Sequence, residues 1–88
     1  MNHVKVLVVD DDANIRELIS IFLSGEGYTV IEAENGQEAL TLLEENNIQI
    51  VVVDVMMPEV DGYELTKEVK KYYDIPILMV TAKGESQD

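Results

Sequence analysis

The stretch IQIVVVDV, residues 48–55, is an almost unbroken apolar run with one acid, Asp54, near its end. Short runs rich in valine and isoleucine are typical of strands buried on both faces of a parallel sheet. A buried ionised carboxylate is costly unless a partner compensates its charge. The stretch therefore predicts a central strand, and it raises the question of what compensates Asp54.

Three further runs of the same kind occur along the chain. They are VKVLVV at 4–9, YTVIEA at 28–33 and IPILMVT at 75–81. Their length and their β-branched content predict strands. The chain therefore contains four expected strands, separated by segments of helical length.

Between these strands, apolar residues recur at the three- and four-residue spacing of a helix with one face on a core. The sets are Ile15, Leu18, Ile19 and Phe22; Ala39, Leu40, Leu42 and Leu43; and Leu65, Val69 and Tyr72. We expect Asp12 to cap the first helix, Gly25 and Gly27 to end it, and Asn35 to start the second. Alternating strands and helices predict an α/β fold, with a doubly wound parallel sheet covered on both faces.

Composition limits the classes of function. The 88 residues form one domain at most, and the net charge of −12 disfavours binding to nucleic acid or to an anionic membrane. The absence of cysteine excludes disulfides and thiolate metal sites. No apolar run reaches the ~20 residues of a membrane span, and the N-terminus lacks the features of a signal peptide. We therefore expect a cytoplasmic protein with cationic or basic partners.

Acidic residues follow two of the expected strands. Asp10, Asp11 and Asp12 come after the first strand, Asp54 ends the third, and Thr81 ends the fourth. Taken singly, residues 10–12 also fit an acidic helix N-terminus, and Asp54 fits a turn after a strand. Ligands of open parallel sheets bind beyond the carboxyl ends of the strands, where neighbouring first and third strands would bring these carboxylates together.

Such a cluster requires compensation. Two like charges ~4 Å apart repel by roughly 4 kcal/mol at an effective dielectric constant of 20. An all-oxygen pocket suits Mg²⁺ or Mn²⁺, so we expect a divalent metal to compensate Asp54. A carboxylate also serves as a nucleophile that forms an aspartyl phosphate, and a hydroxyl such as that of Thr81 donates a hydrogen bond to the phosphoryl group.

Three motifs resemble those of one known family. VLVVDDD at 6–12, VVVDVMMPEVDG at 51–62 and IPILMVTAKGE at 75–85 are similar to the response-regulator receiver domain of two-component signalling. The resemblance runs from residue 4 to residue 88 and is strongest to receivers of the winged-helix transcription-factor class. It implies a flavodoxin-like sheet with strand order 2-1-3-4-5, of which the 88 residues supply the first four strands of five βα units.

The resemblance assigns roles to the acidic residues. Asp54 matches the phospho-acceptor, and Asp10 and Asp11 match the pair that holds Mg²⁺. The backbone carbonyl of Met56 matches the third protein ligand of the metal. These assignments imply a switch that receives a phosphoryl group from a sensor histidine kinase and relays the change to a DNA-binding output domain outside this segment.

Further roles follow from the fourth strand. Thr81 matches the switch hydroxyl, and Ala82 matches the small residue that leaves room for the phosphoryl group. The lysine and the aromatic switch residue of the family's fifth strand have no counterpart here, and Lys83 is not that lysine. We therefore expect this segment to be phosphorylated poorly by itself.

Two other functions stay open, and one assembly is expected. Asp10 and Asp12 have the spacing of a metal-dependent phosphatase of the haloacid-dehalogenase type, although neither the covering cap nor the later lysine that such an enzyme needs is recognised. A purely structural interaction fragment is the other alternative. The fourth strand would be an apolar edge, and the family's last helix would be missing from the face of the first and third strands. A homodimer or an intertwined oligomer is therefore expected.

Overall fold

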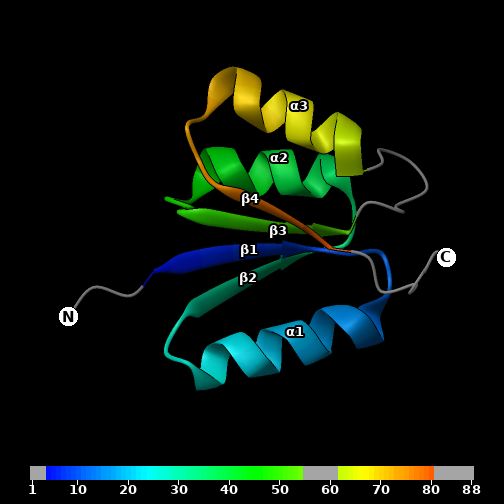
Figure 1. Ribbon diagram of the computed structural model, residues 1–88, viewed down its shortest axis with the longest axis vertical. Helices are drawn as coiled ribbons and strands as arrows, with labels where there is room; N and C mark the ends of the chain where they lie inside the picture. The colour runs from blue at the N-terminus through cyan, green and yellow to red at the C-terminus, as the bar shows by residue number, and fades with distance from the viewer. Residues whose placement is uncertain (1–3, 55–61, 81–88) are drawn as a thin grey trace, which may run out of the picture.

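The computed structural model describes residues 4–54 and 62–80, in which strands and helices alternate along the chain (Figure 1). The elements are β1 Lys5–Val9, α1 Ala13–Gly25, β2 Thr29–Ala33, α2 Gly36–Glu45, β3 Ile50–Asp54, α3 Gly62–Tyr72 and β4 Ile77–Val80. The predicted order of elements is confirmed. The observed strands begin one or two residues later than the apolar runs that predicted them.

The four described strands form one parallel sheet in the order β2-β1-β3-β4. This order confirms the predicted doubly wound, flavodoxin-like arrangement. In its register, Val9 pairs with Ala33 on one side and with Val53 on the other, and Asp54 pairs with Val80. The carboxyl ends of β1, β3 and β4 therefore meet at one edge of the sheet.

One face of the sheet is covered by α2 and α3 (Figure 1). Leu7 and Val9 of β1 and Val51 and Val53 of β3 point into this layer, where all four are essentially inaccessible to solvent. The helices contribute Ala39, Leu43, Leu65 and Val69 to the same cluster. The predicted inward positions of α2 and α3 at these four residues are confirmed, and the Tyr72 side chain lies outside the described part of the structure.

The opposite face carries α1 and is covered less completely (Figure 1). Val6, Val8 and Val52 form its buried centre, and Ile19 and Leu23 of α1 pack against them. Beside α1 runs an open apolar groove of about 360 Å³. Its lining consists of Leu18, Ile19, Phe22, Leu23, Val52, Leu78 and Val80.

The predicted inward face of α1 is wrong at Leu18 and Phe22, whereas Ile19 packs against the sheet as expected. Leu18 is 64% exposed and Phe22 is 66% exposed, although the spacing had assigned both to the core. The helix instead turns Arg16, Ile19, Ser20 and Leu23 toward the sheet, a line displaced by one residue from the predicted one. Since one residue corresponds to about 100° of helix rotation, the displacement moves Leu18 and Phe22 to the outer side.

The expected helix ends are confirmed. Asp12 caps α1, Asn35 caps α2, and Gly27, with φ of 99°, occupies the left-handed conformation that ends the first helical segment. The backbone N–H of Glu38 donates to Asn35 Oδ1 at 2.8 Å, and Glu38 Oε1 accepts from the backbone N–H of Glu34 at 2.8 Å. Across residues 4–54 and 62–80, no helix is long and apolar enough to cross a bilayer.

Candidate functional site

The turn that follows β1 fixes the first acidic residue. Asp10 is 1% exposed, and its backbone N–H donates to the carbonyl oxygen of Ala33 on β2 at 3.1 Å. Its Oδ1 accepts from the backbone N–H of Asp12 at 2.9 Å. Asp10 is therefore held at the carboxyl end of the sheet by one bond to its backbone and one to its buried carboxylate.

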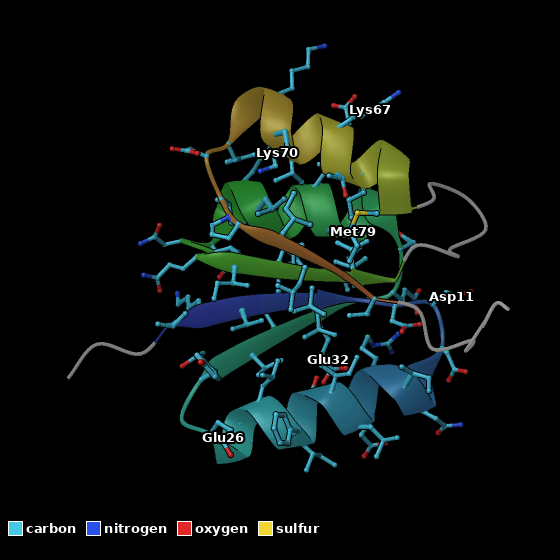
Figure 2. The ribbon with its side chains drawn as sticks, in the orientation of Figure 1. Asp11, Glu26, Glu32, Lys67, Lys70 and Met79 are labelled. Carbon is cyan, nitrogen blue, oxygen red and sulfur yellow. The ribbon has the colours of Figure 1, made fainter. Side chains whose placement is uncertain are left out.

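The next two acids on this turn, Asp11 and Asp12, differ in their hydrogen bonds. Asp11 is exposed at the carboxyl end of the sheet (Figure 2). Asp12 Oδ1 accepts from the backbone N–H groups of Asn14 at 2.9 Å and Ile15 at 3.3 Å. Asp12 is thus committed to capping α1, so Asp10 and Asp11 are the candidate ligand carboxylates of this turn.

A basic side chain holds the same turn from α1. Arg16 Nε donates to Glu32 Oε1 of β2 at 3.0 Å, and its Nη1 donates to the carbonyl oxygen of Asp10 at 2.7 Å. Figure 2 shows Glu32 on the side of the sheet that faces α1. The guanidinium therefore links the first helix, the second strand and the acidic turn.

The phospho-acceptor candidate lies on the neighbouring strand. Asp54 is the last residue of β3 and follows Val53, which pairs with Val9 of β1. Asp10 follows Val9, so the two aspartates occupy the same level on adjacent strands. Paired strands are ~4.8 Å apart, so the two backbones lie side by side at the edge where ligands of such sheets bind.

The remaining predicted site residues lie outside the described part of the structure. They are Met56, Thr81 and Ala82, together with the side chain of Asp54. Among residues 4–54 and 62–80, no group of three potential metal-binding side chains is present. The three-carboxylate cluster therefore stays a prediction. The described donors, a fixed Asp10 carboxylate and an exposed Asp11 carboxylate, fit the oxygen preference of Mg²⁺.

The sequence profile of the response regulator receiver domain matches residues 6–88. The chain belongs to that family. The expected fold and family are thereby confirmed, and the receiver domain is a signalling module of two-component systems. This receiver is 47% identical over 88 residues to a probable transcriptional regulator, ycf27, of Cyanophora paradoxa. The match covers the whole of this chain and 37% of that relative, so the chain spans little more than a third of its length.

Solved structures agree with this assignment. The receiver superimposes on the Vibrio cholerae chemotaxis protein CheY4 with a TM-score of 0.87 and 37% identity, over 96% of this chain and 72% of that one. It is 43% identical to the response regulator TrrA of Thermotoga maritima, solved with Mg²⁺ and BeF, with a TM-score of 0.85 and coverage of 92% and 71%. TrrA has also been solved in complex with the histidine kinase ThkA. The receiver matches a chain of that structure with a TM-score of 0.85 and 40% identity, over 97% of this chain and 74% of that one.

Two residues of the receiver's acidic edge were not found from the sequence. Arg16 contacts the acidic turn and Glu32 contacts Arg16, but neither residue belongs to a recognised motif. The available signal was that Arg16 is the only arginine in the chain and lies six residues after Asp10. Its partner could be identified only from the strand register, which places Glu32 beside Val8.

Proposed function

We propose that this receiver accepts a phosphoryl group on Asp54 from a sensor histidine kinase in a Mg²⁺-dependent reaction. The observation that carries the proposal is the position of a buried, backbone-held Asp10 at the same level as Asp54 on the adjacent strand. Two carboxylates at the binding edge of a parallel sheet are stable together when a cation joins them. The Mg²⁺-containing structure of TrrA supports the choice of metal.

Four groups would hold the metal: the carboxylates of Asp10, Asp11 and Asp54, and the backbone carbonyl of Met56. Mn²⁺ would bind the same oxygen donors. Bound Mg²⁺ would neutralise negative charge on the phosphoryl oxygens. Asp10 is already oriented by Asp12, so its carboxylate need not lose additional conformational freedom when the metal binds.

In the transfer step, a carboxylate oxygen of Asp54 forms a bond to phosphorus while the phosphorus–nitrogen bond of the kinase phosphohistidine breaks. The electron pair of that bond returns to the imidazole. The Thr81 hydroxyl would donate a hydrogen bond to the phosphoryl group, and the small side chain of Ala82 would leave space for it. Each chain accepts one phosphoryl group, so the domain acts as a switch, with slow loss of its own phosphoryl group, rather than as an enzyme with turnover.

The partners and location follow from this role. The complex of TrrA with ThkA supports a histidine kinase as the donor. The similarity to a transcriptional regulator supports a DNA-binding output domain, of the winged-helix class, in the whole protein. Such a pathway operates in the cytoplasm. The acidic receiver would not contact DNA itself, because its net charge of −12 repels a phosphate backbone.

The hydrogen bonds of Asp12 disfavour the phosphatase alternative. That mechanism needs the second carboxylate of the Asp10–x–Asp12 spacing beside the substrate. Asp12 instead accepts two backbone N–H groups of α1. Incubation with a generic phosphomonoester separates the two functions, because a phosphatase releases inorganic phosphate repeatedly and a receiver does not.

Self-association of this segment is the second part of the proposal. Leu18, Phe22 and Leu78 are more than half exposed around the groove beside α1, and β4 is the last strand of the described sheet. An apolar groove next to an edge strand favours pairing with a second copy, as a two-fold dimer or by exchange of elements. The interaction-fragment alternative would retain this surface and lack the metal site.

Calorimetric titration with Mg²⁺ tests the site. We expect wild-type chain to bind Mg²⁺, and Asp11→Asn and Asp54→Ala to weaken binding by roughly tenfold or more, because each removes a charged oxygen ligand. Glu17→Gln removes one exposed acid from α1 outside the turn and serves as the charge-matched control. Equal affinities for wild type and Asp54→Ala would contradict the assignment.

A further inference from the structure

Arg16 occupies an unusual position for a charged residue. Its side chain is only 16% exposed, on the side of α1 that faces the sheet. Its Nε is 3.0 Å from Glu32 Oε1, and its Nη1 is 2.7 Å from the backbone oxygen of Asp10. Both contacts lie within hydrogen-bond distance, and they point to two different segments of the chain.

The contact with Asp10 restrains the link between the two acidic residues. The carbonyl group of Asp10 belongs to the peptide unit that joins Asp10 to Asp11. Because a peptide unit is planar, holding its oxygen fixes the orientation of the whole unit. That orientation determines the directions in which the Asp10 and Asp11 side chains leave the backbone.

Arginine is suited to this task in a way that lysine is not. The planar guanidinium presents donors in fixed directions, so one side chain bonds Glu32 and Asp10 together. Lysine has one nitrogen on a flexible stem. Glu32 is 42% exposed and sits beside Val8 in the sheet, where it holds the guanidinium in the orientation that reaches Asp10.

We propose that Arg16, oriented by Glu32, is a positioning residue that holds the Asp10–Asp11 peptide in the conformation needed for metal binding. This inference rests on the proposed metal site. Backbone N–H groups already make three bonds around the turn: Asp12 to Asp10 Oδ1, Asp10 to the Ala33 oxygen, and Arg16 to the Asp12 oxygen at 2.9 Å. The Arg16 guanidinium adds a bond of a different kind, because it connects the turn to the side chain of Glu32.

The direction of the change in Mg²⁺ affinity distinguishes a positioning role of Arg16 from an effect of its charge. A cation close to a metal site repels the metal, so removing the charge of Arg16 should raise Mg²⁺ affinity if charge alone mattered. Loss of positioning should lower the affinity. Arg16→Met therefore tests the proposal directly, because the two explanations predict opposite changes.

The first experiment titrates the chain with Mg²⁺ and monitors binding through the amide chemical shift of Asp11. We expect Arg16→Met to lower the affinity roughly tenfold, the lower end of the range for residues that orient metal ligands. Arg16→Lys, which keeps the charge but not the planar set of donors, should still lose part of the affinity. Lys67→Met, on the exposed side of α3 (Figure 2), is the control for charge and should match wild type.

Glu32 is tested through its dependence on Arg16. Glu32→Gln should weaken Mg²⁺ binding in the wild-type background but add no further loss to Arg16→Met, because Glu32 acts through the guanidinium. Glu26→Gln, at the far end of α1 (Figure 2), is the matched control for loss of an acid. Additive losses in the double variant would contradict the proposed order of action.

A second readout needs no metal. In metal-free buffer, hydrogen exchange of the Asp12 amide, which bonds Asp10 Oδ1, should be faster in Arg16→Met than in wild type or Lys67→Met. Unchanged exchange, or Mg²⁺ affinity at or above the wild-type value in Arg16→Met, would overturn the role of Arg16. Failure of wild type to bind Mg²⁺ would instead refute the metal site, and the exchange rates would still decide whether Arg16 orders the turn.

Discussion

The two faces of the sheet are made from alternate residues of the same strands, yet they are covered to different extents. On the α2–α3 face, Leu7, Val51 and Val53 have no exposed surface. On the α1 face, the helix leaves Leu18 and Phe22 exposed beside a groove that reaches β4. An apolar strand sequence therefore predicts that both faces of the strand are buried. The extent of burial on each face depends on the helices that pack there.

The helices themselves differ in the same way. Gly36, Ala39 and Leu43 of α2 are buried, and Leu65 and Val69 of α3 have no exposed surface, whereas Ser20 is the one buried residue of α1. The first helix packs on the sheet through the partly buried Ile19 and Leu23, and Arg16 bonds Glu32 and Asp10. The α2–α3 face thus supplies most of the hydrophobic stabilisation, and the α1 face carries the acidic turn.

The largest expected effect compares one substitution on the two faces. Leu65→Ala, on α3, should lower the free energy of unfolding by about 2–5 kcal/mol, because it leaves a cavity in a closed layer. Leu18→Ala, on the exposed side of α1, should change the free energy of unfolding of the dissociated chain by less than about 0.5 kcal/mol. Urea unfolding of both variants measures the difference, and equal losses would show that the groove side of α1 is as well packed as the closed layer.

The next effect concerns association through the α1 face. Phe22→Asp places a charge beside the groove and should raise the dissociation constant of the self-associated chain at least tenfold, or about 1.4 kcal/mol. Gln37→Glu, on the exposed side of α2, adds the same net charge away from the groove and is the control. Sedimentation equilibrium at low micromolar concentration provides the measurement. A wild-type chain that is a cooperatively folded monomer there would contradict the predicted dimer.

The smallest effect separates the two exposed acids of the turn. In metal-free buffer, Asp12→Ala should lower the free energy of unfolding by about 1 kcal/mol, because α1 loses its N-cap. Asp11→Ala should leave it within about 0.5 kcal/mol of wild type, since Asp11 is exposed. Thermal unfolding of both proteins distinguishes them. Similar losses would mean that Asp11, too, has a structural role.

Much of the fold could be predicted from the sequence because local signals agree with the tertiary structure. Each apolar run is a strand, Asp12 and Asn35 cap the helices, and Gly27 adopts the positive φ that was expected of a terminating glycine. The strand order came from the resemblance to receivers. These features depend on neighbouring residues or on a known topology, and both can be recognised without coordinates.

The orientation of α1 could not be predicted by the same means. Apolar side chains at 15, 18, 19, 21, 22 and 23 surround more than half of the helix, so their spacing does not select one inward face. The observed orientation of α1 satisfies polar groups as well, because Arg16 reaches Glu32 and Asp10 only when it points toward the sheet. A contact between residues 16 and 32 depends on strand register, which periodicity does not contain.

The carboxylates of the site were predicted from the ends of strands, whereas the residues that orient them were not. Asp10 and Asp54 lie level because Val9 pairs with Val53, a consequence of placing β1 beside β3. The roles of Met56, Thr81 and Ala82 stay predictions, since these residues lie outside the described part of the structure.

Phosphorylation of Asp54 tests the central claim most directly. Incubation with a small phosphodonor and Mg²⁺, followed by intact-mass spectrometry, should add one acid-labile, hydroxylamine-sensitive phosphoryl group to wild type, at low yield for this segment. Asp54→Asn should abolish the addition, because the amide is not a competent nucleophile. Modification that survives Asp54→Asn would contradict the assignment of the phospho-acceptor.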